Sequence, residues 1–255
     1  MKNSNVQEKS RGVVLFAYNT DTVNYKHIAD QAARLISHVL ALPVTIISDT
    51  VSHNNYRTGY ASGSQWNNLD RYRAYELSPY DETVLLDSDY LVLDDSLLKI
   101  IDTTDDYRLM THSQTPTETM NGDMGMISLN YVWATAVVFK KTPKANLLFD
   151  LVGRIQRNYE YYRKLYNIRE YNFRNDYAFA IADNIINGYT ASPGISWTML
   201  TVDKLIKKIE IKNNSLIIRE DTTAHVIVRQ NIHVIDKLYL QSDVHIHFVD
   251  QICRN

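Results

Sequence analysis

Two kinds of hydrophobic pattern alternate in the first fifty residues, and this alternation constrains the fold more than any other feature of the chain. Residues 12–18 form a short apolar run that is typical of a buried parallel strand. From Asn24 to Leu40 apolar residues recur at helical spacing, and Pro43 ends that helix before a second apolar run at 44–49. A strand, a helix and a strand in this order predict a right-handed βαβ unit with a parallel sheet.

The rest of the chain continues the α/β pattern and changes character near residue 200. Further strands are expected at 83–86, 107–111 and 134–140, and helices at 69–77, from Ser96, at 143–166 and at 176–187. Two polar stretches, 50–68 and 112–130, are expected to be long loops. Beyond them, strand-like alternation occurs at 209–212, 216–219, 224–228 and 244–249, with Asn213-Asn214 as a hairpin turn. The sequence therefore predicts an α/β fold, a sheet flanked by helices, and a β-rich C-terminal segment.

Composition narrows the class of protein. The length of 255 residues suits one domain, so residues 1–255 are expected to form a single unit. With 27 Lys+Arg against 29 Asp+Glu, the net charge of −2 gives no global field toward nucleic acid or an anionic membrane. The single cysteine, Cys253, excludes an intrachain disulfide and a CxxC zinc site. Without a membrane-spanning apolar stretch or an apolar signal core, a cytoplasmic location is expected.

Several common catalytic motifs are missing from the sequence. No GxxxxGK[ST] occurs, and the turn at 18–21 after the first expected strand has no glycine, so neither a P-loop nor a dinucleotide fingerprint is present. The GxSxG and HExxH motifs are also absent. These absences argue against kinases, NAD enzymes, α/β-hydrolases and zinc proteases.

The triplet Asp87-Ser88-Asp89 is the strongest candidate for chemistry. Roughly 1.7 such DxD triplets are expected by chance in a chain of this composition, so the motif alone is not specific. The position of the triplet in the predicted fold is more informative. The triplet follows the apolar strand expected at 83–86, and ligands of open α/β sheets bind at the carboxyl ends of strands. Two carboxylates at this spacing can share a hard cation such as Mg²⁺ or Mn²⁺. The alternative is a polar turn that ends the strand.

Three segments together resemble the metal-dependent, nucleotide-sugar glycosyltransferases of the GT-A fold, with glycogenin-like members nearest in style. They are Val13–Asn19, Leu69–Arg73 and Val84–Val92, within roughly the first 140 residues. The resemblance implies a GT-A-like, Rossmannoid mixed sheet. It also implies a nucleotide-sugar and metal-binding half at 13–140 and an acceptor-side half at 141–255.

The resemblance assigns roles by position. Asp87 and Asp89 would hold Mn²⁺ or Mg²⁺ and the donor diphosphate, with a UDP-sugar first among the donors. The donor-binding residues implied in this way are Ala17, Tyr18 and Asn19 beside the base, Asp49 near the base or ribose, Ser88 within the triplet, and Arg71 or Arg73 near the diphosphate. The two arginines have an alternative interpretation, as solvated charges on a short helix.

A histidine in a late His-Phe segment often supplies a third metal ligand in this family, and His247 occupies a similar place. His245 would share its strand face at a period of two. The glycine and Lys-Pro-Trp continuation typical of the family is replaced here by 250–254. The alternative is two histidines on the polar face of an edge strand. His233 has no such context.

Two carboxylates are candidates for the catalytic role beside the reacting sugar. Asp176 enters a helix where the resembling enzymes often place such a group, and Asp123 lies in a glycine-containing loop. An inverting enzyme needs a base there, whereas a retaining one does not. The alternative for Asp176 is a helix N-cap.

The helix expected at 143–166 has a polar side that predicts an acceptor surface. Arg154, Arg157, Tyr161 and Lys164 fall together at helical spacing. Basic side chains neutralise phosphates and aromatic rings stack on bases, which favours a polyanion such as DNA. The alternative is an ordinary solvated helix face. Compact, Tyr- and Asn-rich transferases of this kind resemble phage enzymes that glycosylate a hydroxymethylated DNA base, and a glycan acceptor stays equally open.

Two other functions remain open from the sequence. A sugar-phosphate nucleotidyltransferase also uses a carboxylate-bound metal, but the glycine-rich basic loop expected after its first strand is missing. A non-catalytic nucleic-acid-binding module would bind DNA without regard to metal. The leading hypothesis is a metal-dependent glycosyltransferase, in the host cytoplasm if the chain is encoded by a phage.

Overall fold

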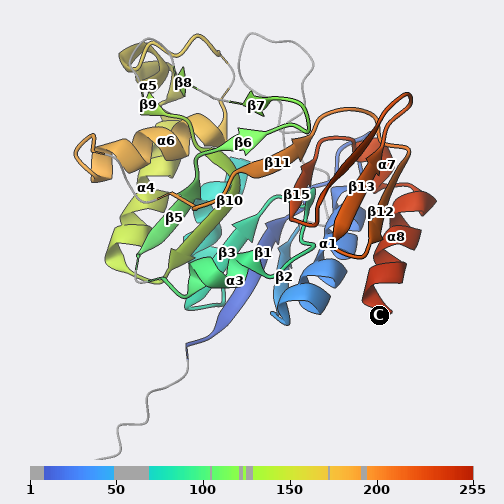
Figure 1. Cartoon of the computed structure of the whole chain (residues 1–255). Coiled ribbons are helices and arrows are strands. Elements are labelled where there is room, and N and C mark those ends of the chain that lie inside the picture. Colours follow the sequence, from blue (N-terminus) through green and yellow to red (C-terminus); the bar gives the residue numbers. More distant parts are fainter. Residues whose placement is uncertain are drawn as a thin grey trace, which may run out of the picture.

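The computed structural model describes residues 9–48, 69–103, 105–120, 123–124, 129–171, 173–190 and 194–254, and its centre is a five-stranded sheet (Figure 1). The strand order is β2-β1-β3-β10-β5. The bounds of these strands are Arg11–Phe16 for β1, Val44–Ile47 for β2, Glu82–Leu86 for β3, Tyr107–Met110 for β5 and Trp133–Lys140 for β10. Strands β1, β2 and β3 are parallel, and β10 runs antiparallel to β3 and β5. The predicted α/β fold with a mixed sheet is therefore confirmed.

Helices cover both faces of this sheet, because the side chains of each central strand point alternately to either face. The helices are α1 (Tyr25–Leu40) and α3 (Ser96–Ile101) on one face, and α4 (Pro143–Arg157) and α6 (Asn175–Ile186) on the other. Val13 and Leu15 of β1 pack with Ile36 of α1, whereas Val14 packs with Phe149 of α4. A strand buried on both faces needs a continuous apolar run, which explains the pattern at the start of the chain.

The short segments between β2 and β3 and around α5 complete this part of the fold. The 3₁₀ helix η1 (Leu69–Arg73) leads into α2 (Ala74–Leu77), and α5 (Tyr159–Leu165) follows α4. The helix predicted at 143–166 is interrupted at Asn158, whose backbone leaves the helical region at φ −120° and ψ 32°. The Asn158 side chain donates to the carbonyl of Arg154, at 2.9 Å. Such competition with the backbone ladder is typical of asparagine.

A second sheet lies beside the first and joins distant parts of the chain. Its order is β4-β15-β11-β6-β7. Its strands are β4 (Tyr90–Leu91), β6 (Ser113–Gln114), β7 (Thr119–Met120), β11 (Met199–Val202) and β15 (Ile232–Val234). The segment 112–130, predicted to be a loop, thus contributes β6 and β7, and also the pair β8 (Asp123–Met124) and β9 (Leu129–Asn130).

The predicted β-rich segment forms a separate three-stranded sheet. Its strands are β12 (Lys208–Lys212), β13 (Ser215–Arg219) and β14 (Ala224–Val228). The hairpin turn at Asn213 has φ 57°, a conformation that asparagine tolerates better than most residues. Apolar side chains on the inner face of this sheet, such as Ile218, pack with Ile28 and Leu35 of α1.

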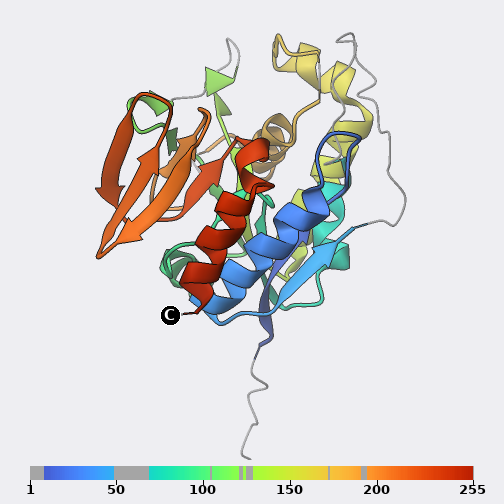
Figure 2. The same ribbon diagram turned by 90° about the vertical axis from the view of Figure 1, so that its right-hand side faces the viewer.

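The prediction of a strand at 244–249 is wrong, because the chain ends in helices. These are α7 (Lys237–Leu240) and α8 (Asp243–Cys253), and α8 runs beside α1 (Figure 2). Ser242 caps α8 by accepting from the backbone N–H of His245. The buried residues His245, Phe248 and Val249 follow the helical spacing of three and four, which a short window of period two had obscured. None of the helices in the described ranges is long and apolar enough to cross a membrane.

The aromatic contacts of Phe149 predict a large stability effect. Its ring meets Phe139 at 4.7 Å and Phe179 at 5.6 Å in edge-on geometry, and the side chain is buried. Phe149→Ala should reduce the free energy of unfolding by about 3–5 kcal/mol in urea titrations, because the cavity cannot fill. Leu147→Ala, on an exposed position of the same helix, should change it by less than about 0.5 kcal/mol. Equal losses in the two variants would show that α4 does not anchor this face of the sheet.

Candidate metal centre

The triplet Asp87-Ser88-Asp89 lies at the carboxyl end of β3, as the sequence predicts, and its backbone is fixed from two sides. The amide of Asp87 donates to the carbonyl of Thr135 on β10, at 2.9 Å. The carbonyl of Asp89 accepts from the amide of Val234 on β15, at 2.9 Å. Ser88 is buried between the two carboxylates. The triplet therefore connects the central sheet to the second sheet and has little freedom to rearrange.

His233 joins the two aspartates, and these three residues form a cluster able to bind a metal ion. One potential ligand atom from each lies within 4.8 Å of the others. The Nε2 atom of His233 lies 3.6 Å from Oδ1 of Asp89. Asp89 Oδ1 and the Nδ1 atom of His233 are buried without a hydrogen-bond partner, which is costly unless a ligand completes them. Two carboxylates with one imidazole fit a divalent cation such as Mn²⁺ or Mg²⁺.

Each aspartate also faces a basic side chain of the protein. Arg71 is buried and donates from Nη1 to Oδ1 of Asp87, at 2.5 Å, and from Nη2 to the carbonyl of Ala134. Lys237 donates to Oδ2 of Asp89. The four side chains have no net charge if all are ionised.

The two carboxyl groups differ in how readily they ionise. Burial raises the pKa of Asp87, and the Arg71 guanidinium offsets this only in part. Although burial also disfavours ionisation of Asp89, the Lys237 ammonium and His233 hold its pKa well below the usual range. Asp89 is therefore the firmly anionic member of the triplet.

Asp176 lies near this cluster, on the first turn of α6. The N-cap of α6 is Arg174, so the alternative reading of Asp176 as N-cap is wrong. Its Oδ1 atom accepts from the amide of Ala134, at 2.9 Å, and its Oδ2 atom accepts from Nε of Arg174, at 2.9 Å. Its negative charge contributes to the raised pKa of Asp87. The structure thus brings a third carboxylate to the carboxyl ends of the central strands.

The residues implied for donor binding lie at or near the same edge of the sheet. Ala17 and Tyr18 are buried directly after β1, and the Tyr18 hydroxyl donates to Asp70, at 3.4 Å. The Asn19 side chain accepts from the amide of Lys26 in α1, at 2.9 Å. Arg73 is half-exposed and lies 3.7 Å from Glu76. Asp49 lies outside the described residues, and of Asp123 only the backbone, paired with Asn130, is described.

His247 is not brought to the triplet. It lies on the exposed side of α8 and shares a hydrogen bond with Gln251, at 2.9 Å. The metal-ligand prediction for His247 came from its resemblance to a late His-Phe segment, and this segment is part of a helix in the structure. His233 takes the third place in the cluster instead. The alternation of Ile232, His233 and Val234 indicates a strand, but no local pattern tells that this strand pairs with β4 beside the triplet.

The predicted acceptor surface on α4 and α5 is exposed in the structure. Arg154, Arg157 and Lys164 are exposed, and so is Tyr161. Lys164 pairs with Glu160, at 3.0 Å, which reduces the local positive charge. Arg154, Arg157 and Tyr161 therefore face solvent on this surface.

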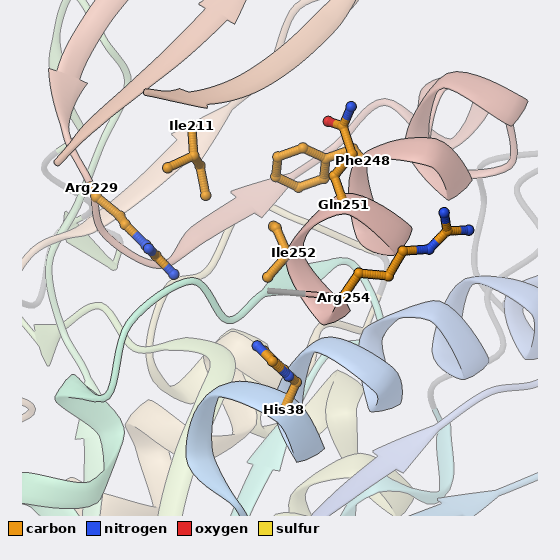
Figure 3. Close-up of a pocket in the computed structure, with 7 residues that line it drawn as sticks. All are labelled: His38, Ile211, Arg229, Phe248, Gln251, Ile252 and Arg254. Carbon is orange, nitrogen blue, oxygen red and sulfur yellow. The ribbon is translucent and has the colours of Figure 1, made fainter. Parts of the chain in front are cut away.

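A cavity of about 640 Å³ lies elsewhere, between α1, α8 and the hairpin of β12 and β13 (Figure 3). It is lined by His38, Ile211, Arg229, Phe248, Gln251, Ile252 and Arg254. Figure 3 shows Arg229 and His38 reaching toward it from different elements. Because Asp87, Asp89 and His233 do not line it, this cavity is separate from the metal cluster.

Comparisons with known proteins find similarity in structure only. No protein-family profile and no curated protein sequence matches the chain. The chain is similar to the glycosyltransferase GlyE of Streptococcus pneumoniae TIGR4, with 14% identity and a TM-score of 0.40 over 68% of this chain and 43% of GlyE. It is similar to the galactosyltransferase LgtC, with 15% identity and a TM-score of 0.44 over 67% of this chain and 69% of LgtC.

A third similar structure is mouse xyloside xylosyltransferase 1, with 10% identity and a TM-score of 0.45 over 71% of this chain and 83% of the mouse protein. The chain thus spans less than half the length of GlyE. All three are glycosyltransferases, the class that the sequence resembles. Similarity at this level places no residue and assigns no substrate, so function has to be inferred from the site itself.

The ion pair between buried Arg71 and half-buried Asp87 predicts a strong effect on stability. Arg71→Met should lower the free energy of unfolding by about 3 kcal/mol, because it removes the buried guanidinium that donates to both the Asp87 carboxylate and the Ala134 carbonyl. Arg73→Met, two residues away and partly exposed, should cost less than about 1 kcal/mol. Adding Asp87→Asn to Arg71→Met should recover part of the loss in chemical denaturation. No recovery would mean that packing of the Arg71 side chain, rather than its charge, carries the effect.

The burial of His245 makes the free energy of unfolding depend on pH. His245 is buried beside Tyr239 and Phe248, and burial lowers its pKa to about 4. Below a pH of about 6.5 the unfolded chain binds a proton that the folded chain excludes, so stability falls as the pH drops toward 4. The loss attributable to this group approaches about 3 kcal/mol at the end of that window.

His245→Leu should therefore flatten the decline in unfolding free energy between pH 7 and 4, measured by denaturant titration at each pH. His247→Leu changes an exposed histidine of the same helix and should keep the wild-type slope. Identical slopes in all three proteins would contradict a buried neutral His245.

Proposed function

We propose that this chain is a metal-dependent glycosyltransferase that moves a sugar from a nucleotide-diphosphate sugar to an acceptor. The observation that supports this most is the cluster of Asp87, Asp89 and His233 at the carboxyl end of β3, with Asp89 Oδ1 buried and unpartnered. In open α/β sheets this edge is where ligands bind. The proposed metal ligands are accordingly Asp87, Asp89 and His233.

The chemistry of the reaction explains why such a cluster is useful. Breaking a glycosyl phosphate bond leaves a nucleoside diphosphate on which negative charge develops, and a bound Mn²⁺ or Mg²⁺ neutralises that charge. Arg71 holds the Asp87 carboxylate in a fixed orientation from behind. The backbone bonds of the triplet to Thr135 and Val234 keep both carboxylates in place. Preorganised groups of this kind need no rearrangement during the reaction.

The donor is proposed to lie along the edge formed by the ends of β1, β2 and β3. Tyr18 and Asn19 follow β1, which is the neighbour of β3, and would border the base, with UDP as the first nucleotide to test. Arg73 is the better of the two arginines for the diphosphate, because both terminal nitrogens of Arg71 are already used by Asp87 and Ala134.

Asp176 is proposed to act beside the transferred sugar. Its carboxylate binds the amide of Ala134, whose carbonyl binds Arg71 beside Asp87, so it lies at the same edge of the sheet. The amide of Ala134 and the guanidinium of Arg174 orient it. It would serve as a base if the enzyme inverts the anomeric centre, and as an orienting group if the enzyme retains it.

The acceptor is proposed to approach from the surface of α4 and α5. Arg154, Arg157 and Tyr161 are exposed there, a combination that suits a polyanion. A hydroxymethylated base in DNA and a glycan are the two acceptors to compare.

Nucleotide binding tests this proposal directly. The melting temperature should be measured with UDP, GDP, CDP, ADP or TDP, each with and without Mn²⁺. One nucleotide should raise it only in the presence of metal, because a ligand at 100 times its dissociation constant stabilises by about 2.7 kcal/mol. Asp89→Asn should abolish the shift, since it removes the firmly anionic ligand.

Asp95→Asn is the matched control, because Asp95 is an exposed carboxylate six residues from Asp89 that makes no capping hydrogen bond. It should keep the full metal-dependent shift. No shift with any nucleotide would reject the proposal. Tight DNA binding that ignores both Mn²⁺ and Asp89→Asn would favour the non-catalytic nucleic-acid-binding module.

A further inference from the structure

Lys237 occupies the place beside Asp89 where a cation is expected. It is the first residue of α7, and its ammonium donates to Oδ2 of Asp89. The same ammonium lies 3.4 Å from the carbonyl of Val234 on β15. The Lys237 side chain is only 22% exposed, so this is a part-buried ion pair and not a surface contact.

A divalent cation at the unpartnered Oδ1 of Asp89 and this ammonium at Oδ2 would compete for one negative charge. Both would sit on the same carboxylate, within a few ångströms of each other, and two like charges at that distance in a partly buried site repel strongly. Asp87 offers no compensation, because its own charge is already balanced by Arg71. A divalent ion bound at Asp89 therefore favours departure of the Lys237 ammonium.

The backbone of Lys237 is fixed, so only its side chain can move. Asp236 caps α7 by accepting from the amides of Leu238, at 3.1 Å, and Tyr239, at 3.0 Å. Its other oxygen accepts from the amide of Ile206, at 2.8 Å. A lysine side chain has a flexible four-carbon stem, so its ammonium can move while the helix stays in place.

A destination for the displaced ammonium is present. Lys237 lines a cavity of about 630 Å³, and none of Asp87, Asp89 and His233 lines it. Its lining includes the acidic residues Asp203, Glu220, Asp221 and Asp236, with Lys204 as the other basic residue. The cavity is thus predominantly acidic, which favours an ammonium that leaves Asp89.

We propose that Lys237 is an internal counter-ion of the metal centre. It neutralises Asp89 when the site holds no metal and is displaced into the acidic cavity when a divalent cation binds. The ammonium and the metal therefore bind in competition, and Lys237 sets a weaker metal affinity than the ligands alone would give. This inference rests on the proposed metal site and deepens it.

Direct measurement of Mn²⁺ binding tests the competition without any assay of activity. The loss of the free-ion electron paramagnetic resonance signal gives the dissociation constant of each protein. Lys237→Met keeps the aliphatic stem and removes the charge, so it should bind Mn²⁺ at least about tenfold more tightly than the wild type, a difference of about 1.4 kcal/mol. Lys207→Met, at an exposed lysine paired with Asp221, should leave the dissociation constant unchanged. Asp89→Asn should lose binding.

Amine acetylation of the wild-type protein provides a second readout that does not depend on a variant folding. Mass spectrometry should show slow labelling of Lys237 without metal and several-fold faster labelling with saturating Mn²⁺. Labelling of Lys207 should not respond to the metal.

The outcomes separate this inference from the proposed function. Wild-type binding of Mn²⁺ that Lys237→Met leaves equal or weaker, with Lys237 labelling indifferent to Mn²⁺, overturns the counter-ion role and keeps the metal site. If Lys237→Met does not fold, the labelling result decides. No Mn²⁺ binding by the wild type or Lys237→Met overturns the metal site and the counter-ion role together.

Discussion

Two neighbouring carboxylates at the end of β3, Asp89 buried and Asp87 half-buried, are the constraint around which the candidate site is built. Isolated ionised groups are costly away from water, so each needs a partner of opposite charge. Arg71 comes from η1 and Lys237 from α7, on either side of β3 in the sequence. The central sheet, the 3₁₀ helix and the C-terminal region thus meet at one electrostatic junction.

The second sheet supplies further parts of this junction. Its strand β15 delivers His233 and binds the carbonyl of Asp89 through Val234, while β11 beside it ties this strand to β6. The helix α8 then packs on α1, where Arg34 and Asp250 form an ion pair at 2.5 Å. The C-terminal segment is consequently held to the first helix at one end and to the site at the other.

The sequence predicted the elements whose signals are local. Continuous apolar runs identified β1 and β3, helical spacing and Asn24 identified α1, and the Asn213 turn identified the hairpin. The prediction failed where a short segment fits both the strand period of two and the helical period of about 3.6. In α8 the helical spacing of His245 and Phe248 is evident only once their burial is known.

The candidate site divides in the same way. Asp87 and Asp89 were found because a strand and the chemistry of the triplet are adjacent in the sequence, and Arg71 lay in a segment singled out by resemblance. His233 and Lys237 could not be found, because they approach Asp89 through pairing of β15 with β4, and register between distant strands leaves no local pattern. His233 and Lys237 were missed because they are far from Asp89 in the sequence, although their side chains are ordinary metal-ligand and ion-pair groups.

The order of these residues along the chain has a consequence for folding during synthesis. Asp87 and Asp89 leave the ribosome well over a hundred residues before His233 and Lys237. A nascent chain that has released β1, α1 and β3 can already pair β1 with β3, but its carboxylate pair then lacks both the imidazole and the ammonium. The amide of Val234 that fixes Asp89 also arrives only then. The candidate metal centre is therefore one of the last features to be completed, because a chain that ends before His233 lacks one of its three residues.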